Sequence, residues 1–120
     1  MLRDHYGAYI PLADINKAYA AHRDDLRAKG LPLKPGAIAL LSALQNAECP
    51  TALVTSSSRR TADRYLELAR IRDRFDAILT RDDVARGKPY PDLYLLAAER
   101  LHVQPKACIA VEDSSPGVTA

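Results

Sequence analysis

Short apolar runs alternate with longer amphipathic stretches along most of the chain. Apolar residues recur every three or four positions in four segments, which predicts helices over 12–29, 35–46, 60–70 and 91–102. Compact apolar runs predict buried strands over 51–55, 75–80 and 107–111. Short strands joined through helices favour right-handed crossovers and a parallel sheet covered on both faces. The sequence therefore predicts a doubly wound parallel α/β sheet.

The segment 31–36 separates the first predicted helix from this alternating pattern. It contains two prolines and a glycine, Pro32, Pro35 and Gly36, which do not sit together inside a regular element. Gly30 is placed to end the preceding helix. We therefore predict a domain boundary here, with residues 1–30 preceding a sheet domain over 31–120.

Composition narrows the class of protein. The chain has 120 residues, the length of one ordinary domain, and its 17 Lys and Arg are interspersed with 15 Asp and Glu, so no basic stripe for nucleic acid stands out. No segment approaches the roughly 20 apolar residues of a membrane span. Residues 1–20 lack the pattern of a secretory signal, which makes the cytoplasm the default expectation. Cys49 and Cys108 are predicted to be buried thiols rather than a disulfide.

Two adjacent carboxylates, Glu112 and Asp113, follow the third predicted strand. Like charges this close raise each other's pKa unless a cation neutralises them, and carboxylate oxygens suit Mg²⁺. In the alternative interpretation the pair merely opens a turn, with Asp113 capping the next helix. Because ligands of such sheets bind beyond the carboxyl ends of the strands, we favour a metal site.

Polar residues also follow the other two predicted strands. The first strand leads into four hydroxyl residues, 55–58, where hydroxyls and amides at a helix N-terminus favour an anion, although a simple serine N-cap is an alternative. After the second strand, Lys88 precedes Pro89, and a lysine on stiffened backbone suits phosphate, although a solvated loop lysine is the simpler alternative. Together the three strand ends predict a site for a magnesium-bound phosphoryl group.

The order and the residues of these motifs resemble those of the haloacid dehalogenase superfamily of phosphohydrolases. The similarity is greatest to the branch with a helical cap, which includes phosphoglycolate phosphatase-like and β-phosphoglucomutase-like enzymes. Residues 52–57 look like the second motif of the superfamily, 87–92 like its third and 111–117 like its fourth. The resemblance covers about residues 31–120, and residues 4–30 resemble the last helix of the cap. It implies a Rossmann-like core, here incomplete, with the C-terminal part of a cap before it.

The resemblance also implies roles for single residues. The Thr55 hydroxyl and the Ser56 amide would hold the transferring phosphoryl group of a small phosphorylated metabolite, and Lys88 would neutralise it together with the attacking carboxylate. Asp113 would bind Mg²⁺ directly, and Glu112 would act through a metal-bound water. Members of the family pass the phosphoryl group to an aspartate and then to water or a second hydroxyl, which makes them phosphatases or phosphomutases.

The chain lacks the Asp-x-Asp pair that carries the nucleophile in this family. No two of its aspartates are separated by a single residue, and neither Asp24-Asp25 nor Asp82-Asp83 follows an apolar strand of the required kind. We therefore expect an internal portion of a longer enzyme, inactive alone. Two alternatives stay open: a non-catalytic phosphate-binding or assembly module, and a receiver-type signalling domain, which would need an aspartate where Thr55 stands. The sequence leaves the substrate and the oligomeric state open.

Overall fold

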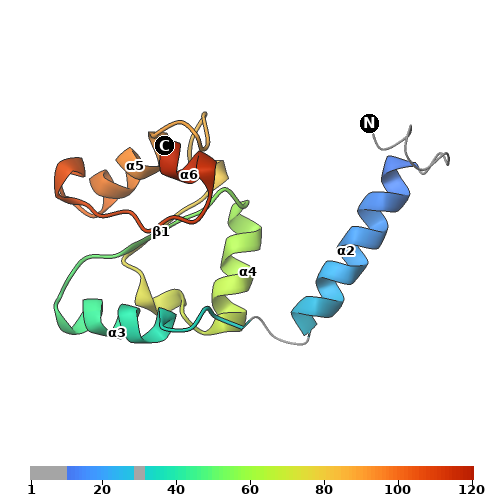
Figure 1. Ribbon diagram of the computed structural model, residues 1–120, viewed down its shortest axis with the longest axis horizontal. Helices are drawn as coiled ribbons and strands as arrows, with labels where there is room; N and C mark the ends of the chain where they lie inside the picture. Colours follow the sequence, from blue (N-terminus) through green and yellow to red (C-terminus); the bar gives the residue numbers. More distant parts are fainter. Residues whose placement is uncertain (1–10, 29–31) are drawn as a thin grey trace. The chain divides into compact units, whose positions relative to one another are not determined.

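The computed structural model describes the backbone of residues 11–28 and 32–120 and the side chains of residues 11–22 and 32–120. The chain divides into two compact units, Met1–Leu31 and Pro32–Ala120. In the first unit the described residues form one helix, α2 (Leu12–Ala28), shown in blue in Figure 1. Gly30, predicted to end this helix, lies outside the described residues. The assignment of the first unit to a cap stays a prediction.

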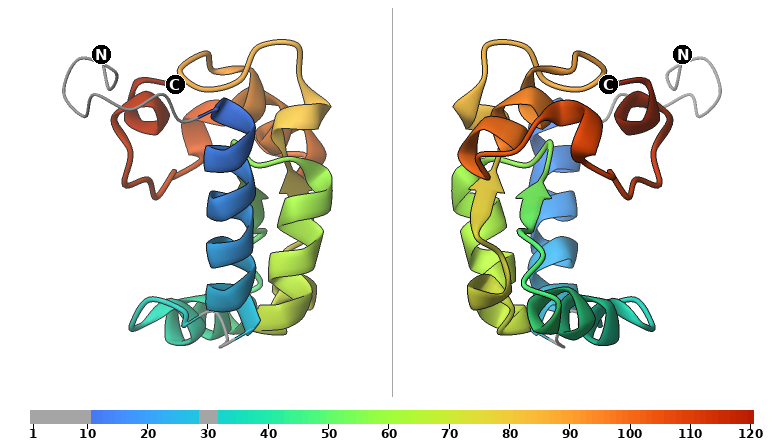
Figure 2. Two further views of the ribbon diagram at one scale, coloured as in Figure 1. Left: turned by 90° about the vertical axis from the view of Figure 1, so that its right-hand side faces the viewer. Right: turned by 90° about the vertical axis from the view of Figure 1, so that its left-hand side faces the viewer.

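The second unit is a parallel α/β structure. Strands β1 (Ala52–Val54) and β2 (Ala77–Leu79) pair in parallel, with Leu53 opposite Ile78. Helix α3 (Ala37–Asn46) precedes β1, α4 (Arg59–Ala69) connects the two strands, and α5 (Asp92–Arg100) follows β2. Figure 2 shows the two strands side by side and pointing the same way, with α3 at the end where they begin. The predicted parallel α/β fold is confirmed.

Short helical turns fill the connections between these elements. The 3₁₀ helices are η1 (Arg72–Arg74), η2 (Arg81–Asp83) and η3 (Pro105–Ala107), and the last helix is α6 (Ser115–Thr119). Turn η2 directly follows β2, so it lies at the same end of the sheet as the loop that follows β1. None of the helices in the described residues has the length and apolar content needed to cross a membrane.

The core lies between the two strands and helix α5. Leu79 of β2 packs with Leu93 and Ala97 of α5, and Leu93 is completely buried. Helix α4 contributes Ala62 and Leu66, which are also buried. Burial of these side chains fixes α4 and α5 against the sheet, and thereby fixes the loops at their N-terminal ends.

The third predicted strand, 107–111, does not form. Residues 105–107 belong to η3, and the residues after them are extended without strand pairing. Ile109 and Val111 are 94% and 86% exposed. A strand needs a neighbour for its backbone hydrogen bonds, and in the part of the chain that the structure describes β1 and β2 pair with each other alone. The prediction of buried thiols is also wrong, because both cysteines are exposed.

Candidate functional site

Thr55 begins the loop between β1 and α4. Its backbone N–H donates to the Leu79 carbonyl (2.9 Å), which continues the pairing of the two strands. Its Oγ1 accepts the Ser57 N–H (3.1 Å), so the hydroxyl hydrogen of Thr55 is left to donate elsewhere. The exposed Ser56 has no hydrogen bond to any residue that the structure describes. A hydroxyl and a backbone amide are therefore available to a bound anion.

Backbone N–H groups in the first turn of helix α4 donate to side chains of the protein. Ser58 is the N-cap, and its side chain accepts the Thr61 N–H (3.4 Å). The Arg59 N–H donates to Oδ2 of Asp82 (2.8 Å), a residue of η2. Two amides of the first turn, those of Arg59 and Thr61, are thus already occupied. The hydroxyl hydrogen of Thr55 and the backbone N–H of Ser56 remain available in this loop.

Lys88 lies against the carboxyl end of β1. Its Nζ is 3.5 Å from the carbonyl oxygen of Val54, the residue before Thr55, and it forms an ion pair with Oε2 of Glu112. The Lys88 side chain is only 7% exposed. Burial alone would lower the pKa of Lys88, but its interactions with Glu112 and Tyr94 outweigh that effect and raise the pKa. Lys88 is therefore a fixed positive charge beside the loop that begins at Thr55.

The Glu112 carboxylate is the most heavily bonded acceptor of the site. Oε2 accepts from Tyr94 Oη (2.8 Å) in addition to Lys88, and Oε1 accepts from the hydroxyl (2.7 Å) and N–H (3.0 Å) of Ser114. The bond from Lys88, followed by those from Ser114 and Tyr94, holds the pKa of Glu112 far below its usual value. Glu112 is therefore ionised and fixed in place.

Gly117 of α6 leaves the space that the Glu112 side chain fills. A Cβ atom at position 117 would lie 2.0 Å from Cδ of Glu112 and 2.2 Å from its Oε2. No side chain fits at that distance without moving the carboxylate. The Gly117 N–H also donates to Oγ of Ser114 (3.2 Å), which caps α6. The alternative in which Asp113 caps this helix is therefore wrong.

Asp113 stands apart from the Lys88–Glu112 pair. Its carboxylate lies 3.5 Å from Nζ of Lys34, and both side chains are more than four-fifths exposed. An exposed ion pair of this kind contributes little to stability, so the carboxylate can exchange Lys34 for another cation at low cost. The structure thus places Asp113 next to Glu112 in the chain, with its carboxylate open to solvent.

The carboxylates of Glu112 and Asp113 can be compared with the ligands that Mg²⁺ takes in proteins. The described residues contain no cluster of three or more His, Cys, Asp or Glu side chains that could hold a metal by itself. Mg²⁺ commonly takes one or two protein carboxylates and completes its shell with water and substrate phosphate. Asp113 offers one such carboxylate, whereas both oxygens of Glu112 already accept hydrogen bonds. The residues fit an ion that depends on its substrate for part of its coordination.

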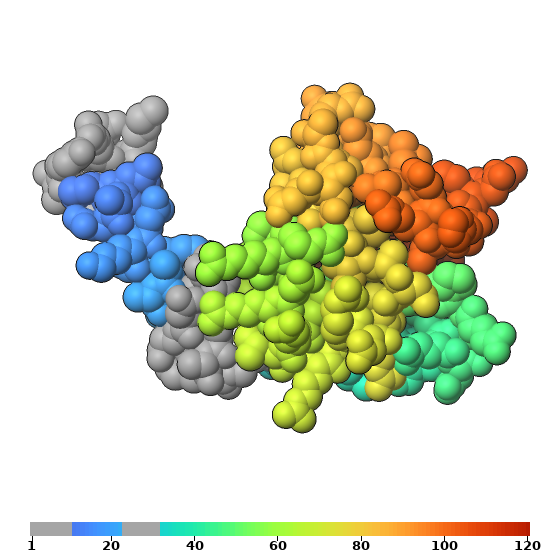
Figure 3. Space-filling model, turned by 180° about the vertical axis from the view of Figure 1, so that it is seen from behind, coloured from blue at the N-terminus to red at the C-terminus, as the bar shows by residue number. Residues whose placement is uncertain are grey.

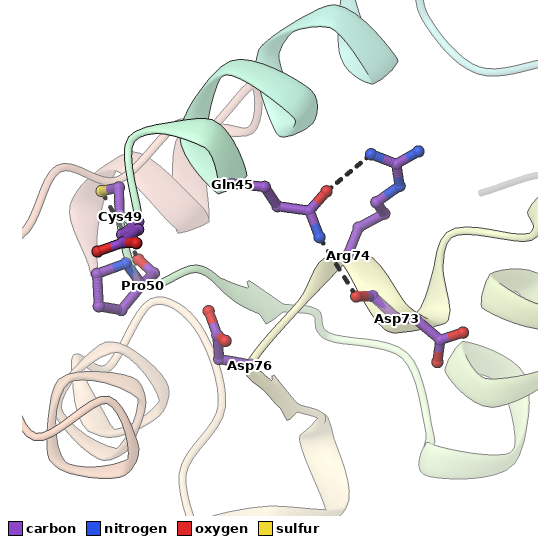
Figure 4. Close-up of a pocket in the computed structure, with 7 residues that line it drawn as sticks. Gln45, Cys49, Pro50, Asp73, Arg74 and Asp76 are labelled. Atoms are coloured by element: carbon purple, nitrogen blue, oxygen red, sulfur yellow. Dashed lines mark hydrogen bonds between the residues drawn. The ribbon is translucent and has the colours of Figure 1, made fainter.

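A hollow of about 400 Å³ lies at the opposite end of the sheet (Figure 4). Its wall includes Pro50 and Asp76, which precede β1 and β2, together with Gln45 and Arg74. Arg74 Nη1 donates to Oε1 of Gln45 (2.7 Å), which ties α3 to the start of β2. None of the five predicted site residues lines this hollow. It belongs to the packing of α3 rather than to the candidate site.

Comparison with known proteins assigns the chain to a family. Residues 4–120 match the family described as haloacid dehalogenase-like hydrolase. The chain belongs to this family. Hexitol phosphatase A of Escherichia coli (strain K12) is 39% identical over 95% of this haloacid dehalogenase-like chain and 53% of its own length. The chain thus spans about half the length of that relative.

Two solved structures share the fold of this haloacid dehalogenase-like chain. One, from Thermotoga maritima and provisionally named a beta-phosphoglucomutase, has a TM-score of 0.86 and 30% identity over 98% of this chain and 55% of that one. The other is CbbY from Rhodobacter sphaeroides in complex with phosphate, with a TM-score of 0.72 and 34% identity. This match covers 93% of the present chain and 52% of the CbbY chain.

The structure brings some of the predicted site residues together and adds one. Lys88 and Glu112 are in contact, and Lys88 lies beside the residue preceding Thr55. The Asp113 carboxylate contacts neither of them. Tyr94 was missed by the sequence analysis, although it lies on the predicted helix 91–102, six positions after Lys88. Its place in the first turns of α5, beside the buried Leu93, is the signal that could have indicated it.

Proposed function

We propose that this chain carries the phosphate-binding part of a Mg²⁺-dependent phosphohydrolase or phosphomutase of the haloacid dehalogenase type, acting on a small phosphorylated metabolite. One observation carries the proposal: the buried Lys88 ammonium group is held by Glu112 at the carboxyl end of β1, one residue from Thr55. A positive charge fixed before the substrate arrives stabilises a phosphoryl group without the cost of reorganisation.

Each residue has a defined part in this proposal. The Thr55 hydroxyl, whose oxygen already accepts the Ser57 N–H, donates its hydrogen to a phosphoryl oxygen, and the Ser56 N–H donates to another. Lys88 neutralises the charge on these oxygens. Asp113 would bind Mg²⁺ directly, and Glu112 would contact it through water. The ion would supply further neutralisation of the phosphoryl oxygens.

The chain alone is proposed to bind phosphate without turning over phosphate esters. No Asp-x-Asp pair occurs in the sequence, so the chain offers no aspartate of the family's kind to accept the phosphoryl group. A non-catalytic phosphate-binding module is the second candidate. Such a module would cover the exposed apolar residues Ile109 and Val111 by packing against another protein surface. Both candidates require the same anion site.

Titration of the chain with inorganic phosphate, with and without Mg²⁺, tests the anion site. We expect saturable binding, followed by ³¹P NMR, that weakens at least tenfold in Lys88→Met, because the fixed counter-charge is removed. Lys106→Met is the matched control. Lys106 is exposed on η3, so this substitution removes the same charge at a different place on the protein. Equal effects of the two substitutions would refute a specific role for Lys88.

A turnover assay separates the enzyme fragment from a complete catalyst. We expect no hydrolysis of a chromogenic phosphate ester by the chain in the presence of Mg²⁺. Hydrolysis that Lys88→Met abolishes would show that the chain finds its nucleophile elsewhere, and the proposed inactivity would be wrong.

A further inference from the structure

The acidic pair Asp82-Asp83 has no part in the proposed chemistry, yet both carboxylates bind Arg59, the residue that directly follows the loop 55–58. Asp83 Oδ2 accepts from the N–H of Thr80 (2.6 Å), from its hydroxyl (2.7 Å) and from Nη2 of Arg59 (2.7 Å). Thr80 is completely buried at the end of β2. Asp83 is thus anchored to the sheet on one side and to the first residue of α4 on the other.

Arg59 is bound at three places. Its guanidinium also donates to the carbonyl of Ile78 in β2 (2.9 Å), and its backbone N–H donates to Asp82 (2.8 Å). A further bond joins the two loops directly, from the Arg81 N–H to the carbonyl of Ser57 (3.0 Å). Seen from behind in Figure 3, the segment around residues 80–90 lies directly against one end of α4.

These bonds replace the apolar anchors that the loop 55–58 lacks. Its four residues are one threonine and three serines, which bury little apolar surface, so their conformation depends on hydrogen bonds. The bonds from Arg59 to Asp83 and to Asp82 involve a charged partner and are stronger than neutral ones. Burial would raise the pKa of Asp83, but the hydrogen bonds from Thr80 and Arg59 outweigh burial and lower the pKa, so the carboxylate is ionised at neutral pH.

We propose that Asp83 is a positioning residue for the phosphate site. Through Arg59 and Thr80 it holds the loop 55–58 in the conformation that leaves the Thr55 hydroxyl and the Ser56 amide open to an anion. This inference rests on the proposed function, because it assigns a purpose to the conformation of that loop.

Simple electrostatics predicts the opposite effect of Asp83 on phosphate. A carboxylate near an anion site repels the anion, so its removal should strengthen phosphate binding by Coulomb's law. A positioning role predicts weaker binding after removal, because the loop loses its conformation. The sign of the change therefore distinguishes the two effects.

Asp83→Asn is the first test, with Asp76→Asn as the matched control. Asp76 also accepts a short bond from a backbone N–H, that of Thr51 (2.7 Å), but at the opposite end of the sheet. We expect Asp83→Asn to weaken binding of inorganic phosphate about tenfold, as expected for the loss of one charge-assisted hydrogen bond. Asp76→Asn should leave the affinity within about twofold at equal folded fraction.

Arg59→Lys is the second test, because it leaves the net charge unchanged. Nη2 of Arg59 donates to both Asp83 and Ile78, and the shorter lysine side chain places its ammonium nitrogen one bond nearer the backbone, out of position for both acceptors. We expect this variant also to weaken phosphate binding about tenfold. In both variants the amide hydrogens at positions 59 and 81, which bridge the two loops, should exchange at least tenfold faster, measured by NMR.

The outcomes separate this inference from the function on which it rests. Unchanged or tighter phosphate binding in Asp83→Asn overturns the positioning role, whether or not exchange accelerates. Unchanged exchange at Arg59 and Arg81 overturns it as well. If the unsubstituted chain binds no phosphate, the proposed function itself fails, and the positioning role falls with it.

Discussion

Lys88 and Glu112 lie 24 residues apart in the sequence and form the ion pair at the centre of the candidate site. Tyr94 belongs to the same cluster: its hydroxyl bonds Glu112, and its ring centroid lies 4.9 Å from Nζ of Lys88. One aromatic side chain thus contacts both charges. Helix α5 is fixed by the burial of Leu93, and through Tyr94 it links the loop that carries Lys88 to the segment that carries Glu112.

Tyr94→Phe is expected to lower the free energy of unfolding and to leave the chain folded. The substitution removes the hydroxyl that donates to Glu112 and keeps the ring beside Lys88. Urea denaturation measures the change. Tyr90→Phe is the control, because the Tyr90 hydroxyl bonds no residue in the ranges whose side chains are described, 11–22 and 32–120. A loss of equal size in both variants would show that the bond to Glu112 contributes nothing.

Gly117→Ala is expected to displace the Glu112 carboxylate and to destabilise the second unit by about 2 kcal/mol, the usual cost of overpacking. The added Cβ would lie 2.0 Å from Cδ of Glu112, and the closest atoms belong to a side chain held by several bonds. Phosphate affinity should fall too, since Lys88 loses its partner.

Val118→Ala is the matched control for this substitution on the same short helix. Val118 is 72% exposed, so its truncation should change the free energy of unfolding by less than about 0.5 kcal/mol. If Gly117→Ala behaves like Val118→Ala in denaturation and in phosphate titration, then Glu112 has room to move without loss.

The sequence pattern predicted the helices and the pairing of β1 with β2, because each of these depends on residues close together in the chain or on adjacent αβ units. It failed at 107–111, since apolar residues show which side chains favour burial and not whether a neighbouring strand is present to pair with them. The motif spacing indicated Lys88 and Glu112. The contact of Tyr94 with Glu112 and that of Asp83 with Arg59 depend on how α5 and η2 are placed, which no local pattern specifies.

The exposure of residues 109–111 leads to a further prediction. Ile109→Thr and Val111→Thr should each change the free energy of unfolding by less than about 0.5 kcal/mol, because these side chains contact little of the protein. Leu79→Ala, in the core of β2, should cost about 3 kcal/mol in the same measurement. A cost above about 1 kcal/mol for either threonine variant would mean that the segment packs against the rest of the chain in solution.

The low pKa of Glu112 sets the sign of a pH dependence. Because its pKa is lower in the folded protein than the usual 4.5, the folded state binds protons less readily than the unfolded state. The stabilisation is complete above about pH 4.5 and is lost as the pH falls through the folded-state pKa. Urea denaturation over a series of acidic pH values should therefore show stability falling below that point. Glu112→Gln removes the titrating group, so its stability should be lower at neutral pH and should fall less steeply on acidification; curves of equal slope would show that Glu112 is not the group responsible.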